Sequence, residues 1–234
     1  MVNKTALLFF TRTAASEAAN KTFVPVSNRK TNSKVASVFI QHSRKVANSS
    51  GLPVYELNEH KQTGNGFGEK LANAMEGVFN AGFENVIVIG NDCPQLTVAI
   101  ISTAKEELAK HPLVLGPDSR GGVYLIGINK AIFQRERFIS GKWQTTHLFQ
   151  NLQSIFWETS SYILPALKDV NNFRDLISLK DFLRSIHPIK DLITSILASI
   201  FQKHSHSRIT HNKFLYSLFG LRAPPVYSLP IYSL

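Results

Sequence analysis

The sequence predicts a three-layer α/β/α fold with a mainly parallel central sheet, followed by a partly helical C-terminal extension. Two observations predict it: short apolar runs alternate with longer amphipathic segments, and polar or glycine-rich segments follow the ends of the apolar runs. Strands joined through helices make right-handed crossovers and run in one direction, with helices on both faces of the sheet. We therefore expect one domain over residues 1–177 and a basic extension over residues 178–234.

Five short runs are predicted to be strands. The first, residues 6–10, is wholly apolar, which is typical of a strand that is buried on both faces. The clearest, residues 85–90, is rich in β-branched side chains and ends abruptly in Asn91 and Asp92, so we place it at the centre of the sheet. The other three runs are residues 52–57, 113–116 and 122–128.

Three amphipathic segments between these runs are predicted to be helices. One covers residues 35–47 and follows a polar stretch over residues 11–34. The second follows the glycine-rich segment 62–68 and stops at Gly82, where a left-handed cap is expected. The third covers residues 98–110, because Pro112 prevents a helix from continuing.

Composition limits the partners and the cellular location. The chain has 26 Lys and Arg against 16 Asp and Glu, a net charge of +10, so it attracts anions such as nucleotides, nucleic acid or acidic lipid headgroups. Its single cysteine, Cys93, cannot form an internal disulfide, so we expect a cytoplasmic protein. No run approaches the roughly 18 to 20 apolar residues of a membrane span, so we do not expect an integral membrane protein.

Asp92 is the first candidate for chemistry, because it follows a buried strand at the sheet edge where sites of α/β folds lie. Pro94 restrains the backbone just beyond it. Mg²⁺ and Mn²⁺ prefer carboxylate and phosphate oxygens, and they are commonly held by one or two side chains plus the phosphates of the substrate. On residue type alone, Asp92 could equally cap the turn into the following helix.

Three segments resemble, in order and spacing, a glycosyltransferase-like bacterial family of unassigned function. They are residues 67–74 (Phe-Gly-Glu-Lys-Leu-Ala-Asn-Ala), 88–97 (Val-Ile-Gly-Asn-Asp-Cys-Pro-Gln-Leu-Thr) and 115–127 (Leu-Gly-Pro-Asp-Ser-Arg-Gly-Gly-Val-Tyr-Leu-Ile-Gly). Residues 142–145 are similar to the family's Trp-x-Thr segment, and residues 168–176 to its closing Asp-rich motif. The family has the Rossmann-like GT-A, or nucleotide-diphospho-sugar transferase, fold and is related in architecture to molybdopterin guanylyltransferases. The resemblance covers about residues 5–177.

The resemblance implies that a nucleotide or nucleotide sugar binds at the strand ends, with Mg²⁺ or Mn²⁺ as cofactor. Asp92 is then the acid that faces the metal, and Asp169 a second metal ligand, although Asp169 read alone is an exposed loop acid before a helix. Gly68, Gly121 and Gly122 are expected to let the backbone approach the ligand, although Gly121 and Gly122 could simply form a turn. Trp143 is expected to stack on a base or sugar, although a Trp more often packs in a core.

The chain also departs from the family. Where the family has a phosphate-holding Lys-Thr-Arg-Leu motif, only Arg12, Lys21 and Thr22 could be remnants, and Arg12 and Lys21 are our candidates to bind phosphate. The family's Asp-Gly-Gly is here Arg120-Gly-Gly, a base where a metal or a sugar hydroxyl would require an acid. Asp118 could reach in its place, and we take it as a candidate catalytic residue.

These residues favour a metal-assisted transferase that uses a nucleotide-activated donor, by glycosyl or nucleotidyl transfer. The alternative is a family member that binds a nucleotide or a protein partner without turnover; Arg120 favours it, whereas the retained Asp92, Gly121 and Gly122 favour the transferase. Nucleic-acid binding has only the net charge in its support and ranks last.

In the extension, six apolar residues form a helical stripe: Leu192, Ile193, Ile196, Leu197, Ile200 and Phe201. The stripe could pack on the domain, mediate homo-oligomers or lie on an anionic membrane surface. We expect His204, His206 and His211 to be solvated, because no acid or cysteine cluster accompanies them.

Overall fold

A computed structural model describes residues 4–24, 29–185, 190–191 and 194–195. Residues 1–196 form one compact unit, and every described residue belongs to it. The apolar stripe expected in the extension and its three histidines lie outside the described residues. Within the described part of the chain, no helix is long and apolar enough to cross a membrane.

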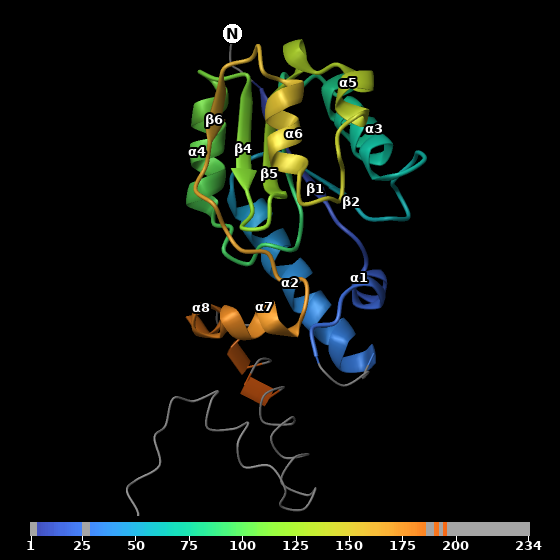
Figure 1. The fold of residues 1–234 in the computed structure, drawn as a ribbon, viewed down its shortest axis with the longest axis vertical. Helices are drawn as coiled ribbons and strands as arrows, with labels where there is room; N and C mark the ends of the chain where they lie inside the picture. Colours follow the sequence, from blue (N-terminus) through green and yellow to red (C-terminus); the bar gives the residue numbers. More distant parts are fainter. Residues whose placement is uncertain (1–3, 25–28, 186–189, 192–193, 196–234) are drawn as a thin grey trace, which may run out of the picture. The chain divides into compact units, whose positions relative to one another are not determined.

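The centre of the fold is a six-stranded sheet with the order β2-β1-β3-β5-β4-β6 (Figure 1). The strands are β1 Thr5–Phe10, β2 Val54–Leu57, β3 Asn85–Ile89, β4 Leu113–Pro117, β5 Val123–Asn129 and β6 Ser161–Ile163. Strand β1 is parallel to β2 and β3, and β4 is parallel to β6, whereas β5 is antiparallel to β3 and β4. Strand β5 reverses because the turn that joins it to β4 is too short for a crossover. The mainly parallel sheet that the sequence predicts is confirmed.

Helices cover both faces of the sheet. The helices are α1 Ala14–Asn20, α2 Arg29–Ser49, α3 Phe67–Asn80, α4 Val98–Leu108, α5 Arg135–Ile139, α6 Leu148–Ile155, α7 Phe173–Ser178 and α8 Lys180–Ser185, with a 3₁₀ turn at Lys130–Ile132. Buried side chains of α3, α5 and α6 pack on one face of the sheet, and those of α2 and α4 pack on the other. The three-layer α/β/α arrangement is therefore confirmed.

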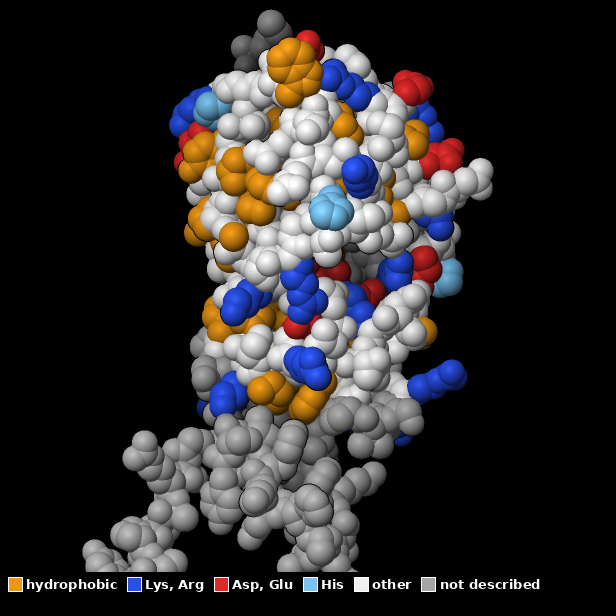
Figure 2. Space-filling model, viewed as in Figure 1, with side chains coloured by type: hydrophobic (Ala, Val, Ile, Leu, Met, Phe, Trp, Pro, Cys, Tyr) orange, Lys and Arg blue, Asp and Glu red, His pale blue; other side chains and the backbone are white. Residues whose placement is uncertain are grey.

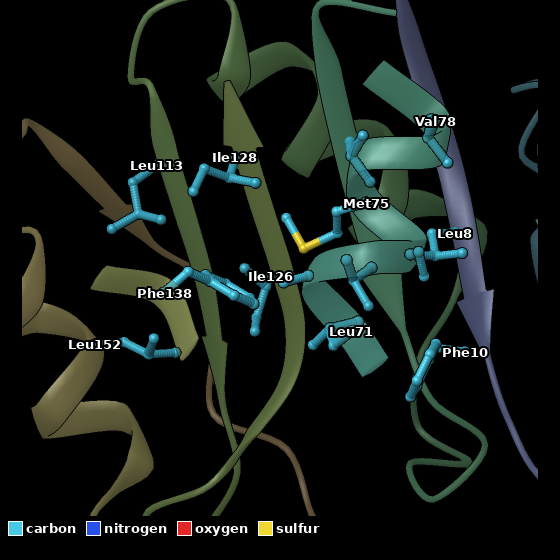
Figure 3. Close-up of a cluster of buried hydrophobic side chains, with 14 of the residues drawn as sticks. Leu8, Phe10, Leu71, Met75, Val78, Leu113, Ile126, Ile128, Phe138 and Leu152 are labelled. Atoms are coloured by element: carbon cyan, nitrogen blue, oxygen red, sulfur yellow. The ribbon is translucent and has the colours of Figure 1, made fainter. Parts of the chain in front are cut away.

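Strand β1 shows why residues 6–10 are wholly apolar. Successive side chains of a strand point to opposite faces, so Leu8 joins the core under α3 while Leu7 and Phe9 join the core under α2 and α4. Figure 3 shows the first of these cores, in which Leu8 lies with Leu71, Met75 and Val78 of α3. A strand that is covered on both faces favours apolar side chains at successive positions, and in β1 the polar exception is Thr5, its first residue.

Helix α1 is the main local difference from the sequence prediction, which treated residues 11–34 as a polar stretch without a helix. Thr13 caps α1 by accepting a hydrogen bond from Ser16 N at 3.3 Å. The helix has too few large apolar residues to show a helical period, and Glu17 is its buried residue. Helix α2 also begins earlier than expected, at Arg29.

Candidate functional site

A cleft of about 690 Å³ lies at the carboxyl ends of β1 and β3. Its walls come from the β1–α1 loop, the residues that follow β3, the β4–β5 turn, the start of α3 and the loop 143–146. Figure 2 shows basic and acidic side chains gathered around a hollow in the described surface. Six of the predicted site residues line the cleft, namely Arg12, Lys21, Asp92, Asp118, Gly122 and Trp143, whereas Gly68, Gly121 and Asp169 lie next to its walls.

Asp92 faces this cleft, and its side chain is 39% exposed. Its Oδ1 atom accepts a hydrogen bond from Asn91 Nδ2 at 3.1 Å and forms an ion pair with Lys21. The Asn91 Oδ1 atom in turn accepts a hydrogen bond from Thr11 Oγ1 at 2.9 Å, which ties the end of β3 to the end of β1. The carboxylate is thus held in a fixed direction while part of it stays open to a ligand.

Lys21 and Glu17 form a buried pair beside Asp92. The Lys21 Nζ atom lies 2.7 Å from Glu17 Oε1, and the two side chains are only 13% and 5% exposed. Burial opposes the charge of Lys21, but Asp92 and Glu17 outweigh it and raise the lysine pKa. Burial and then Asp92 raise the pKa of Glu17, although Lys21 acts in the opposite direction. Sequence reasoning missed Glu17, whose available signal was an acid four residues before a lysine.

Asp169 is brought to the site by the segment 167–172. Leu167 N donates to Pro117 O at 3.1 Å, Ser119 N donates to Leu167 O at 2.9 Å, and Val170 N donates to Asp92 O at 2.8 Å. The segment therefore runs between the end of β4 and the end of β3. The Oδ1 atom of Asp169 is buried and has no hydrogen-bond partner among the described residues. Burial, followed by the charges of Asp92 and Asp118, raises the pKa of Asp169 to about 8.

Asp118 organises the β4–β5 turn. Its Oδ1 atom accepts hydrogen bonds from Arg120 N at 2.6 Å and Gly122 N at 2.8 Å. A Cβ atom on Gly122 would lie 2.4 Å from Asp118 Oδ2, and one on Gly121 would lie 1.9 Å from Thr146 O. Gly121 also has a φ of 86°, in the left-handed region. Close packing thus accounts for both glycines, and ligand contact at them stays a prediction.

Arg120 has a partner of its own. Its guanidinium forms an ion pair with Asp175, whose Oδ2 atom accepts hydrogen bonds from Asn171 N at 2.9 Å and Asn172 N at 3.2 Å. Asp175 and Asn172 form a capping box at the start of α7. The base that replaces the family's acid therefore connects the β4–β5 turn to α7.

Trp143 is half buried and serves as part of a wall. Its Nε1 donates to Phe138 O at 3.0 Å, and its ring centroid lies 4.7 Å from that of Phe138 and 5.7 Å from that of Phe67. A Cβ atom on Gly68 would lie 2.5 Å from Trp143 Cδ1, so the glycine lets this ring lie against α3. The ring packs as core residues do and also lines the cleft, and stacking on a ligand stays a prediction.

Two further polar residues hold the β1–α1 loop that carries Arg12. Glu59 accepts hydrogen bonds from Thr13 N at 2.6 Å and Thr13 Oγ1 at 2.5 Å. Gln62 Nε2 donates to Thr11 O at 2.8 Å and to Leu57 O at 3.1 Å. Sequence reasoning missed both, because Thr13 lies 46 positions from Glu59 and Thr11 lies 51 positions from Gln62 in the chain. They fix the loop that lies beside Asp92.

The acids of the site fit a divalent cation only in part. Among the described residues, no group of three His, Cys, Asp or Glu side chains is arranged to hold a metal ion. Asp92 offers a partly exposed carboxylate, and the unpartnered Oδ1 of Asp169 is a second oxygen close by. Mg²⁺ and Mn²⁺ can complete such a shell with water and substrate phosphates. The residues therefore suit a cation that arrives together with a phosphate ligand.

Comparison with protein families and curated proteins gives one match. Residues 28–145, half of the chain, match the family DUF2064, which is described as an uncharacterized protein conserved in bacteria. The matched range includes Asp92, Asp118 and Trp143 and leaves out Lys21 and Asp169. A comparison with curated proteins found no match.

Solved structures show the fold. A crystal structure from Desulfovibrio desulfuricans G20, of a provisionally assigned nucleotide-diphospho-sugar transferase, has a TM-score of 0.73 at 18% identity and covers 83% of this chain and 97% of its own. A Mycobacterium tuberculosis H37Rv protein in complex with manganese has a TM-score of 0.44 at 11% identity, over 75% and 97% of the two chains. A CMP:2-keto-3-deoxy-manno-octonic acid synthetase with bound CTP has a TM-score of 0.42 at 9% identity, over 78% and 99%. Only the first is close enough to support the GT-A-like fold, and none of them establishes an activity.

Proposed function

The chain belongs to the DUF2064 family, and we propose that it is a transferase that binds a nucleotide-activated donor in its cleft, with Mg²⁺ or Mn²⁺ on Asp92. The observation that carries this proposal is the position of Asp92. Its carboxylate is fixed at the carboxyl end of a central strand, opens into the cleft and lies beside a buried lysine. Anionic ligands of α/β folds bind at this edge of the sheet.

The lining of the cleft suits a diphosphate joined to a less polar group. Four basic side chains, those of Arg12, Lys21, Lys70 and Arg120, line it and attract phosphate oxygens. The half-buried rings of Phe67 and Trp143 form an aromatic wall in the same cleft, against which a base or sugar can pack. Phosphate and ring thus find complementary surfaces within one cavity.

In the proposed reaction, the oxygen of an acceptor hydroxyl attacks the sugar carbon or the α-phosphorus of the donor, and the hydroxyl proton is released to solvent. The bond to the leaving group breaks, and nucleoside diphosphate or pyrophosphate departs with the electron pair. The cation, when bound, neutralises the charge that grows on the leaving phosphate. Asp92 would hold the cation, and Arg12 and Lys21 would bind the phosphate oxygens.

Calorimetry with UDP-glucose, GDP-mannose and CTP, each with and without MnCl₂, tests the proposal. Asp92→Asn should lose manganese-dependent binding while its circular dichroism stays unchanged. Asp191→Asn is the matched control, because Asp191 is exposed and lies outside the cleft lining. Equal manganese-dependent binding by wild type and Asp92→Asn would count against the proposal, as would the absence of binding to all three compounds.

One observation favours binding without turnover as the second candidate. The Asp118 Oδ1 atom accepts two backbone N–H groups of its own turn, and Arg120, which stands where the family has an acid, is paired with Asp175, so both residues make contacts that stabilise the turn. Product analysis by mass spectrometry at saturating donor separates the two candidates. Binding without loss of the donor over a long incubation, with candidate acceptors present, would favour the second.

A further inference from the structure

Lys21 stands where the proposed cation has to bind. Its ammonium group forms ion pairs with both Asp92 and Glu17 and is largely buried among them. The Nζ atom itself is buried, although the side chain of Lys21 contributes to the lining of the cleft. In the ligand-free protein, the negative charge of Asp92 is therefore already balanced from within the chain.

A divalent cation on Asp92 would have to share this carboxylate with the ammonium of Lys21. Two cations on one carboxylate repel each other, and partial burial weakens the screening between them. The described residues also offer few further ligands, because no third acid or histidine completes a site with Asp92 and Asp169. Protein groups alone are thus a poor match for the cation, whereas a phosphate ligand would supply both oxygens and negative charge.

We propose that Lys21 is an internal counter-cation that excludes divalent metal from Asp92 until a phosphate ligand binds, and that Glu17 is the positioning residue that keeps Lys21 in place afterwards. This inference rests on the proposed function, since it concerns the same site. When phosphate enters, Lys21 shifts its contact from Asp92 to the phosphate, and Asp92 becomes available to the metal. Glu17 stays paired with Lys21 in both states, which explains why an acid is buried in α1.

The first test titrates MnCl₂ alone into ligand-free protein by calorimetry. Lys21→Gln should bind Mn²⁺ at least tenfold more tightly than wild type, because Asp92 and Glu17 lose their internal cation. Lys21→Arg keeps the charge and should bind as weakly as wild type. Lys105→Gln, an exposed lysine on α4, controls for the change in net charge. If Lys21→Gln binds Mn²⁺ no more tightly than wild type, the inference is wrong.

Lys21→Gln leaves the carboxylates of Glu17 and Asp92 without their cation and can unfold for that reason. A double variant therefore provides a second test. Glu17→Gln with Lys21→Gln removes the pair without leaving a buried charge on Glu17. It should stay folded by circular dichroism and should also bind Mn²⁺ more tightly than wild type. Unchanged Mn²⁺ affinity in the folded double variant would overturn the proposal.

The second test measures the coupling between metal and phosphate. MnCl₂ is titrated into wild type with and without saturating UMP, against a protein-free blank that corrects for the manganese–UMP complex. UMP should tighten Mn²⁺ binding at least tenfold in wild type and less than threefold in Glu17→Gln, with Glu17→Asp restoring part of the coupling. Coupling of equal size in wild type and Glu17→Gln would remove the role of Glu17. Failure of nucleotide binding would overturn the proposed function. The manganese titration without UMP needs no nucleotide, so it still tests the role of Lys21 independently.

Discussion

The guanidinium of Arg120 forms an ion pair with the carboxylate of Asp175, 55 positions along the chain, and so joins the β4–β5 turn to α7. Asp175 is the less exposed partner, with 11% of its side chain accessible against 45% for Arg120. The pair holds a wall of the cleft to a helix that follows the sheet in the sequence. Loss of this ion pair should lower the stability of the protein and change the shape of the cleft.

Arg120→Ala should lower the free energy of unfolding by about 1 to 2 kcal/mol, because Asp175 loses its cation but keeps its backbone N–H partners. Arg120→Asp, which restores the acid of the family motif, should cost more, since it faces Asp175 with a like charge. Urea denaturation measures both. Arg44→Ala, which breaks the more exposed pair with Glu56, is the control and should cost less than about 1 kcal/mol. Equal losses for Arg120→Ala and Arg44→Ala would contradict this assignment.

Gly68→Ala should destabilise the protein by about 1 to 3 kcal/mol, because the added methyl group would overlap the Trp143 ring. Gly77→Ala on the same helix meets nothing within 4 Å and should stabilise it by up to about 1 kcal/mol, as alanine does in a helix. Thermal and urea denaturation of the two variants give the comparison. Stabilisation of Gly68→Ala as well as Gly77→Ala would show that Trp143 does not pack tightly on α3.

Gln144 is the single described residue other than glycine with a positive φ, at 61°, and it lines the cleft beside Trp143. Gln144→Gly should raise the free energy of unfolding by about 0.5 to 1 kcal/mol, because glycine adopts this conformation without strain. Gln153→Gly in α6 should act in the opposite direction, by about 1 kcal/mol, because its backbone is helical. Urea denaturation decides, and a loss of stability in Gln144→Gly would show that the loop is unstrained.

The raised pKa of Asp169 makes stability depend on pH. The folded protein holds the proton up to about pH 8, whereas the unfolded chain releases it near the ordinary value of 3.8. Binding of this proton raises the free energy of unfolding in full below pH 3.8, and this stabilisation is lost as the pH rises to about 8. Asp169→Asn should therefore be more stable than wild type at pH 9, by about 1 to 3 kcal/mol, and nearly equal to it at pH 4. Urea denaturation across this range is the measurement, and a constant difference between the two proteins would contradict it.

The strands could be predicted from sequence because burial on both faces leaves a plain apolar run, as in β1 and β3. The reversed direction of β5 was harder to predict, since it follows from the length of one turn and leaves no mark in the strand itself. Helix α1 was not predicted because its Ala, Ser and Glu residues form no clear apolar pattern with a helical period. Its cap, Thr13, is also held by Glu59, which lies far along the chain.

The candidate site, like the fold, could be predicted only in part from the sequence. Asp92 could be predicted because it closely follows an apolar strand, and the end of that strand places it in the cleft. The position of Asp169 depends on where the segment 167–172 crosses the strand ends, and the partner of Arg120 depends on α7. Such contacts join distant segments, and a single sequence holds no local pattern for them.

The segment 167–172, whose hydrogen bonds link the ends of β3 and β4, is also synthesised after every strand of the sheet. A nascent chain that ends at residue 166 already contains all six strands of the sheet, yet it lacks Asp169, and Arg120 has no carboxylate to meet. The residues of the sheet therefore leave the exit tunnel of the ribosome before the last residues of the candidate site. The candidate site is complete only when the segment 167–172 lies across the strand ends.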